Sequence, residues 1–355
     1  MPERALDPLA VLERRLRMLA GSIDAEWGVY VRFLDRGDEI GIDADRMIDT
    51  MSLIKVPILV ALMRRVDRGE IDLGRRITLE EDHKRLGTGV LRLFDAGASF
   101  TLHDAARMMI VVSDNTATDL CLEAAGGVDG VNACLSELKI EGVRVTGTAL
   151  DWFRALASSM DPELGRLAPG ELARRGYPDL GPAGIADARA RYHFEGGRPF
   201  GLATARGLGA LLARVHEKNC ATADSCDEII SILRAQQHRQ EIPKYLWGAS
   251  IASKTGNFEP FIASDIGIVT PYSGSPVVMC FLNQHHRGAR ALLEDCVARM
   301  SELVLMAAEA RAGAELGRTG SRAGATEIVG GGRHASEGQD GGRDRGASRH
   351  RFRDR

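Results

Sequence analysis

The sequence predicts an α+β fold, in which an antiparallel sheet flanked by helices is combined with a helical lobe. Strand-like segments occur near both ends of the chain, at 27–45 and at 248–284, and helical patterns fill much of the region between. Because helices and strands bury their apolar faces against a second layer, we expect the two terminal segments to share one sheet covered by helices. The groove between this sheet and the helical lobe is the natural place for a site.

The N-terminal part of the chain predicts a helix, a hairpin and a series of buried helices. Leucines at helical spacing indicate an amphipathic helix over 5–20. "WGVYVRFLD" (27–35) and "DEIGIDAD" (38–45) predict two strands joined through Arg36-Gly37. Between 52 and about 135, "LIKVPILVALMRRVDRG", "TLHDAARMMIVV" and "TATDLCLEAAGG" predict helices, several of which end at glycines.

The C-terminal part predicts helices and then three strands. Residues 141–200 are rich in Pro, Gly and Arg, and no secondary structure is assigned to them. Helices are expected at 204–218, 226–237 and 289–311, and strands at "GASIASKTG", "ASDIGIVTP" and "SPVVMCFLNQ". Residues 1–312 would then form one catalytic domain, with a sheet lobe (about 15–50 and 204–312) and a helical lobe (about 52–200). Residues 313–355 have few large apolar side chains and predict a disordered Gly/Arg-rich tail.

The composition argues against several classes of function. The formal net charge of −3 gives no broad basic surface for nucleic acid, and no apolar run is long enough for a membrane span. The first 21 residues lack the apolar core and cleavage site of a signal peptide, so the sequence as written predicts a cytoplasmic protein. The six cysteines include no C-x-x-C pair, and no His or Cys cluster has metal-ligand spacing. We therefore expect buried free thiols, no metal and no other cofactor, and we expect a monomer.

Lys55 is an unexpected residue in the apolar stretch "TMSLIKVPILVAL" (50–62). Burying an ammonium group among such neighbours costs several kcal/mol unless the group is paired or deprotonated. On a helix, Ser52 and Lys55 share a face, and a lysine of lowered pKa can accept the serine proton. The alternative interpretation is that Lys55 reaches water from an ordinary helix end.

Two tripeptides favour the catalytic interpretation. Ser113-Asp114-Asn115 follows an apolar helical run, and Lys254-Thr255-Gly256 lies within a strand-like segment. Both tripeptides, in this order after the S-x-x-K pattern of Ser52 and Lys55, would arise by chance in roughly one such chain in a thousand. The set resembles the class A branch of the serine β-lactamase/penicillin-binding protein family. The resemblance covers about residues 10–312 and implies a β-lactamase/transpeptidase-like fold.

The resemblance implies a role for each matching residue. Ser52 would be the acylated nucleophile, Lys55 would accept its proton, and Ser113 would relay a proton to the leaving nitrogen. Lys254 would keep the site electropositive for a small-molecule substrate that carries a carboxylate.

The same resemblance implies four substrate-binding positions. Asn115 would hold the side-chain amide of the substrate, and Thr255 would bind its carboxylate. Gly256 would let the substrate lie against the strand. The backbone N–H groups of Ser52 and Asn257 would form the oxyanion hole.

The residue that activates water for deacylation is harder to place. The family carries a glutamate within E-P-E-L-N between its second and third motifs, and the nearest match here is Asp161-Pro162-Glu163-Leu164-Gly165. Asp161 would take the place of this catalytic glutamate, but its side chain is one methylene shorter. Gly165 would replace the asparagine that holds the water. Glu163 and Glu171 are alternative bases. In the structural alternative, Asp161 only caps a helix that begins at Pro162.

Three functional hypotheses follow. The protein is a class A-like β-lactamase that hydrolyses a cyclic amide through an acyl-serine, a D-alanyl peptidase or esterase of the same fold, or a slowly deacylating penicillin-binding or sensor protein. If the start codon is mis-assigned, the resemblance would favour a periplasmic or secreted protein. Two aromatic segments, Trp152-Phe153 and 191–197, either line the mouth of the cleft or form a small core.

Overall fold

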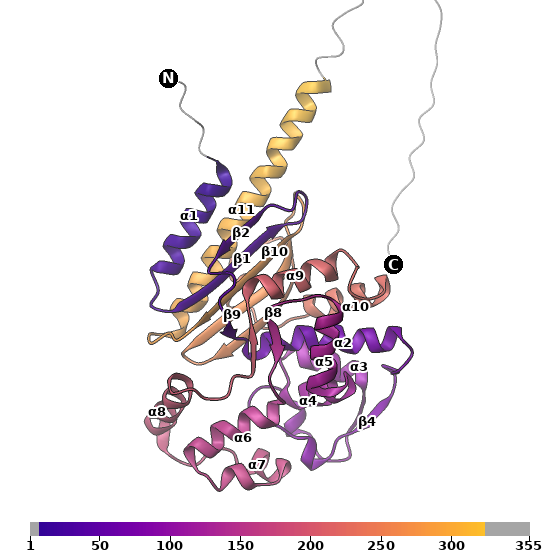
Figure 1. The fold of residues 1–355 in the computed structure, drawn as a ribbon, viewed down its shortest axis with the longest axis vertical. Coiled ribbons are helices and arrows are strands. Elements are labelled where there is room, and N and C mark those ends of the chain that lie inside the picture. Colours follow the sequence, from indigo (N-terminus) through magenta and orange to yellow (C-terminus); the bar gives the residue numbers. More distant parts are fainter. Residues whose placement is uncertain (1–6, 324–355) are drawn as a thin grey trace, which may run out of the picture. The chain divides into compact units, whose positions relative to one another are not determined.

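The computed structural model describes the backbone of residues 7–323 and the side chains of residues 7–313. Its main sheet has five strands in the order β2-β1-β10-β9-β8, and all neighbouring strands are antiparallel. The strands are β1 (Glu26–Phe33), β2 (Glu39–Ile42), β8 (Ser250–Phe258), β9 (Ile262–Thr270) and β10 (Val277–Gln284). The predicted sheet shared by the two terminal segments is therefore confirmed, and β8 is one of its edge strands (Figure 1).

Helices cover both faces of this sheet. Helices α1 (Pro8–Gly21) and α11 (Arg290–Ala323) pack on one face, where Leu16 and Val297 are buried together with Val29 of β1. Helix α9 (Ala205–His216) packs on the other face. The contact is close, because a Cβ at Gly209 would lie 2.3 Å from the ring of Tyr30 on β1.

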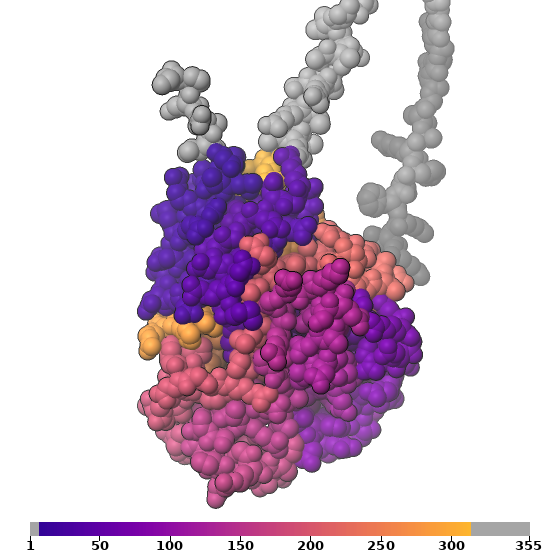
Figure 2. All heavy atoms as spheres, viewed as in Figure 1, coloured from indigo at the N-terminus to yellow at the C-terminus, as the bar shows by residue number. Residues whose placement is uncertain are grey.

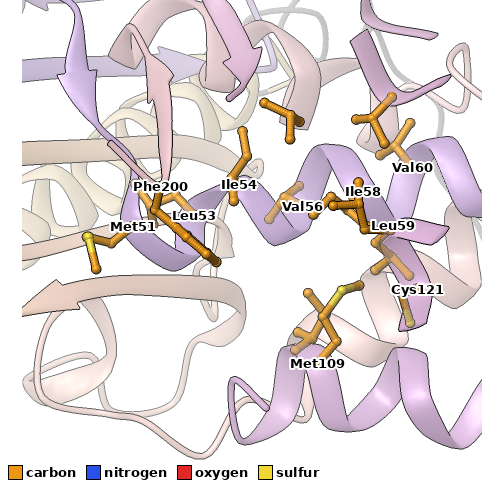
Figure 3. Close-up of a cluster of buried hydrophobic side chains, with 14 of the residues drawn as sticks. Met51, Leu53, Ile54, Val56, Ile58, Leu59, Val60, Met109, Cys121 and Phe200 are labelled. Atoms are coloured by element: carbon orange, nitrogen blue, oxygen red, sulfur yellow. The ribbon is translucent and has the colours of Figure 1, made fainter. Parts of the chain in front are cut away.

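The helical lobe is built around α2 (Lys55–Asp67), whose first nine residues are all buried. Figure 3 shows the apolar side chains around this helix, including Ile58 and Leu59 from α2 and Met109 and Cys121 from its neighbours. The surrounding helices are α3 (Leu102–Val111), α4 (Asn115–Ala124), α5 (Gly127–Glu137) and α10 (Ala223–Arg234). A two-stranded sheet, β4 (Arg76–Thr78) with β5 (Ser99–Thr101), lies between α2 and α3 in the sequence.

Residues 141–200, to which no secondary structure was assigned, contain three helices. They are α6 (Ala149–Met160), α7 (Pro169–Arg175) and α8 (Gly181–Phe194). A small sheet, in the order β3 (Ile48–Asp49), β7 (Gly201–Ala203), β6 (Val143–Val145), ties the ends of this segment to the chain just before Ser52. Figure 2 shows these helices as a continuous surface at the end of the domain remote from α1.

Short 3₁₀ helices complete the described chain: η1 (Met51–Ile54), η2 (Glu81–His83), η3 (Leu91–Leu93), η4 (Leu164–Arg166) and η5 (Ile242–Lys244). The last helix extends to Ala323 rather than ending at 311, so residues 313–323 of the predicted tail are helical. The rest of that predicted tail, 324–355, lies outside the described residues. All six cysteines are buried and free, as predicted. No helix in the described part of the chain has the length and hydropathy to cross a membrane.

Candidate active site

The turn that carries Ser52 is held in a strained conformation. Ser52 lies in η1, directly before α2, and the preceding Met51 has a φ of 43°. A left-handed conformation of a non-glycine residue costs about 1–3 kcal/mol and persists only where its surroundings fix it. Here Asp49 supplies that support, because its carboxylate accepts N–H bonds from Met51 (3.0 Å) and from Phe200 (3.2 Å). Burial raises the pKa of Asp49 to about 6.

Edge strand β8 runs close against this turn at Gly256. A Cβ at this position would lie 2.3 Å from the backbone oxygen of Thr50 and 3.1 Å from the backbone nitrogen of Leu53. Gly256 therefore lacks a side chain because β8 packs on η1. The substrate contact expected of Gly256 stays a prediction.

The same packing places a backbone N–H group on the cleft side of β8. Asn257 is paired with Ala263 on β9, but both the N–H and the C=O of Ala263 bond to the side chain of Asn283. The backbone groups of Ala263 thus point away from β8, which identifies a non-hydrogen-bonded pair. In such a pair the N–H of Asn257 points to the free edge of the sheet. This geometry is compatible with an oxyanion hole formed with Ser52.

Lys55 is fully buried at the first position of α2. Its Nζ bonds to the backbone oxygen of Ser113 (2.6 Å), to Ser113 Oγ (3.0 Å) and to Asn115 Oδ1 (2.9 Å). Burial, followed by the nearby charge of Lys254, holds its pKa well below the usual range of a lysine. The alternative in which Lys55 reaches water is wrong. Among the described residues, no hydrogen bond joins Lys55 to Ser52, so the transfer of the Ser52 proton stays a prediction.

Lys254 approaches the same hydroxyl from the sheet. It is fully buried, and its Nζ bonds to Ser113 Oγ (3.1 Å) and to the backbone oxygen of Thr255 (2.8 Å). Burial lowers the pKa of Lys254 to about 7, against the opposing effect of Asp265 and Glu241. Ser113 Oγ therefore lies between two lysine nitrogens whose protonated forms are both disfavoured.

The segment 113–115 is fixed mainly by its own aspartate. Ser113 has a φ of 55° and lies between α3 and α4. The Asp114 carboxylate accepts N–H bonds from Val90 (2.7 Å), Leu91 (2.9 Å) and Ala117 (2.9 Å), so its role is to hold the turn. Asn115 begins α4 and donates from Nδ2 to the oxygen of Leu86 (3.0 Å).

These groups meet at a cleft of about 300 Å³. Five of the predicted residues line it, namely Ser52, Ser113, Asn115, Thr255 and Asn257. The other lining residues are mostly apolar or aromatic and come from distant parts of the chain: Met51, Gly87, Thr88, Trp152, Phe153, Leu156, Tyr177, Arg189, Phe200, His238 and Phe258. Among the described residues, no cluster of His, Cys, Asp or Glu side chains could hold a metal ion.

A sequence model of the beta-lactamase enzyme family matches residues 11–307. The chain belongs to this family. A beta-lactamase of Streptomyces fradiae is 27% identical over 76% of this chain and 77% of its own length. A beta-lactamase regulatory protein, BlaB, of Streptomyces cacaoi is 34% identical, but the match spans only 30% of that protein.

Solved structures share the β-lactamase fold. A beta-lactamase from Sphaerobacter thermophilus has a TM-score of 0.66 at 22% identity, with 86% of this chain and 98% of that chain covered. The structure of PBP-A has the same TM-score and identity over 85% of this chain and 97% of that chain. At this level of identity the likeness concerns the fold alone.

The aromatic part of the β-lactamase cleft forms one packed group. The ring centroid of Trp152 lies 5.0 Å from that of Phe153 and 5.2 Å from that of Phe258, and both pairs have edge-to-face geometry. Trp152 and Phe153 are buried as well as cleft-lining, so both interpretations of this segment hold. Sequence reasoning missed Tyr177, Arg189 and Phe258, because nothing in their local pattern links them to Ser52.

Asp161 is not among the residues that line the cleft. It is the C-cap of α6, and its carboxylate accepts the N–H of Glu163 (2.9 Å) in the turn that leads into η4. The structural alternative is thus close to what is observed, although the element that follows Pro162 is a short 3₁₀ helix. Glu163 and Glu171, the alternative bases, do not line the cleft either.

Two buried carboxyl groups lie behind the cleft strand. Glu241 Oε1 accepts the side-chain N–H of Asn257 (3.0 Å), and Asp265 Oδ2 accepts the backbone N–H of Ile242 (3.1 Å). Burial raises the pKa of both carboxyl groups. The charge of Glu294 raises the pKa of Glu241 further, and the charge of Glu241 raises the pKa of Asp265 further. Sequence reasoning did not assign Glu241, whose only signal is its position shortly before a strand.

Proposed function

We propose that the protein is a serine hydrolase of the class A β-lactamase type, which opens a cyclic amide through an acyl-Ser52 intermediate. The observation that carries this proposal is the position of Ser113 Oγ, which bonds to Lys55 and to Lys254 beside a cleft that Ser52 lines. Membership of the beta-lactamase enzyme family supports it.

Acylation follows from these groups. Ser52 Oγ attacks the carbonyl carbon of the lactam as its proton passes to the neutral amine of Lys55. The N–H groups of Ser52 and Asn257 stabilise the resulting oxyanion. When the C–N bond breaks, the nitrogen takes a proton from Ser113, whose hydroxyl is reprotonated by Lys55, the amine that received the Ser52 proton. No external proton is consumed, and the product is an ester of Ser52.

One end of the cleft is suited to the carboxylate of the substrate. Lys254 and the hydroxyls of Ser113 and Thr255 provide charge and hydrogen-bond donors there. His238 also lines the cleft, and burial followed by the charge of Lys254 lowers its pKa. A bound carboxylate would favour the protonated forms of Lys254 and His238. Binding of the substrate would thus increase the positive charge that attracts its carboxylate.

A second candidate function is a penicillin-binding protein that releases its acyl group slowly. The specific observation is that no Asp or Glu is among the described residues that line the cleft, whereas deacylation needs a base that activates water. The amines of Lys55 and Lys254 and the imidazole of His238 are the nitrogen bases at or next to the cleft.

One experiment tests the proposal and separates the two candidates. The intact mass of the full chain is followed over time after mixing with benzylpenicillin, beside the variant Ser52→Ala. An adduct that forms only with Ser52 and then clears as product accumulates supports the hydrolase. An adduct that persists supports the penicillin-binding candidate, and no adduct at all overturns the acyl-serine proposal.

The quaternary state belongs to the proposal as well. We propose a monomer that acts on a small carboxylate-bearing substrate without nucleic acid. Light scattering of the purified chain would test the monomeric state.

A further inference from the structure

Arg189 is a cationic residue in the cleft that the proposed mechanism does not use. It lies on α8 and is half-buried, and it is the one arginine among the described residues that line the cleft. No hydrogen bond or ion pair joins it to another described residue. Arg191, two positions later on the same helix, has a partner in Asp187 at 3.5 Å.

The contact that Arg189 does make fixes its orientation. Its guanidinium carbon lies 4.8 Å from the centroid of the Phe258 ring, so that a cation–π contact supports one face of the group. A guanidinium group that rests on a ring keeps its in-plane N–H donors free at its edges. Burial lowers the pKa of Arg189, but an arginine stays protonated at any physiological pH. The cleft therefore contains a positive charge that has lost part of its hydration without gaining an anionic partner.

This charge is separate from the predicted carboxylate pocket. Phe258 lies three residues beyond Thr255 on β8, which corresponds to roughly 10 Å along an extended strand. Between and around these positions the wall of the cleft is aromatic, from Trp152, Phe153 and Phe200. A ligand that pairs with both Lys254 and Arg189 needs two anionic groups joined by an apolar or aromatic body.

We propose that the natural substrate carries an aromatic acyl side chain with a second carboxylate, and that Arg189 binds this second carboxylate as a specificity-determining residue. The inference rests on the proposed function, because it takes the acyl group to be the part of the substrate that lies toward Phe258. A bidentate guanidinium–carboxylate contact is among the strongest hydrogen-bonded pairs in proteins, and here it would form in a partly desolvated cleft.

Two penicillins that differ by one carboxylate test the inference. Benzylpenicillin and carbenicillin share the same phenyl-bearing side chain, and carbenicillin adds a carboxylate on its α-carbon. The second-order rate constant of Ser52 acylation is measured for both compounds with the wild type, with Arg189→Gln and with the control Arg191→Gln. The control removes the same charge from the same helix outside the cleft.

We expect the ratio of the carbenicillin rate constant to the benzylpenicillin rate constant to fall by about tenfold or more in Arg189→Gln and to stay unchanged in the control. An equal ratio in Arg189→Gln and the wild type, with both proteins acylated, would overturn the inference and leave the proposed function intact. In that case Arg189 would serve only to cover Phe258.

A binding measurement keeps the inference testable if acylation fails. The dissociation constants of both penicillins are determined by calorimetry for Ser52→Ala and for the double variant Ser52→Ala/Arg189→Gln. Tighter binding of carbenicillin that disappears in the double variant supports the Arg189 site even where no acyl-enzyme forms. Equal binding of the two compounds to Ser52→Ala, or no binding of either, overturns it.

Discussion

The packing of β8 on η1 predicts a large effect of a single methyl group at Gly256. In Gly256→Ala the new Cβ would lie 2.3 Å from the backbone oxygen of Thr50 and 2.8 Å from Cγ of Leu53. The first of these atoms belongs to the backbone, so the clash cannot be relieved by a side-chain rotation. Either η1 or β8 must move by about 1 Å to restore an ordinary contact distance.

Two quantities follow from this displacement. Overpacking of this kind costs about 1–3 kcal/mol of unfolding free energy. A shift of about 1 Å between the nucleophile and the oxyanion donors would slow acylation by about 100-fold. The effect on the rate should therefore exceed what partial unfolding explains, because most of the variant would still be folded.

The assay combines urea unfolding with the acylation rate by benzylpenicillin. Gly21→Ala is the matched control, since a Cβ at Gly21 meets no atom within 4 Å. We expect the control to keep the wild-type rate and stability. If Gly256→Ala is acylated at the wild-type rate and loses less than about 0.5 kcal/mol of unfolding free energy, the close packing of β8 on η1 is refuted.

Three further predictions concern charged groups. The pKa of Lys254 is lowered to about 7 in the folded protein, so this residue destabilises the fold fully below pH 7 and less as the pH rises toward the pKa of lysine in the unfolded chain. The free energy of unfolding, measured by urea titration, should therefore increase from pH 7 to pH 9, and it should increase less in Lys254→Met. An equal increase in the two proteins would contradict the lowered pKa. Asp161→Asn should leave deacylation within about twofold if the carboxylate only caps its turn, and a loss of 100-fold in single-turnover release would restore it as the base. Asp119→Ala should cost about 3 kcal/mol in chemical unfolding, since it removes the carboxylate that pairs with the largely buried side chain of Arg85 and leaves the N–H of Ala149 without its acceptor; a loss below 1 kcal/mol would show that water replaces the carboxylate.

The elements that sequence reasoning located are those whose pattern is local. The hairpin at 27–45 and the three strand-like runs within 248–284 can be located from their local composition, and they form β1, β2 and β8–β10 within a few residues of the predicted bounds. The three motifs were also found, because each is a run of neighbouring residues. The structure explains why they belong together, since Ser113 Oγ contacts both lysines.

The parts that escaped prediction depend on distant contacts. In α8 the apolar residues follow no single face, so nothing in 181–194 distinguishes a helix from a loop. Arg189 lines the cleft because α8 packs beside α6 and the guanidinium lies over Phe258 of β8. The role of Asp161 depends on the same kind of information, because a motif match near the expected position does not say where a turn directs its carboxylate.

The pairing of β1 with β10 has a consequence for how the protein is made. Glu26 is opposite Gln284, and the Gln284 side chain bonds both to the Glu26 carboxylate and to the backbone N–H of Asp49, 258 and 235 residues away in the chain. During synthesis on a ribosome, Ser52 emerges long before β8 can supply Lys254 or the N–H of Asn257. A nascent chain that stops short of residue 284 should therefore carry an unreactive serine, and reactivity toward penicillin would appear late and all at once, with the slow closure typical of non-local sheets.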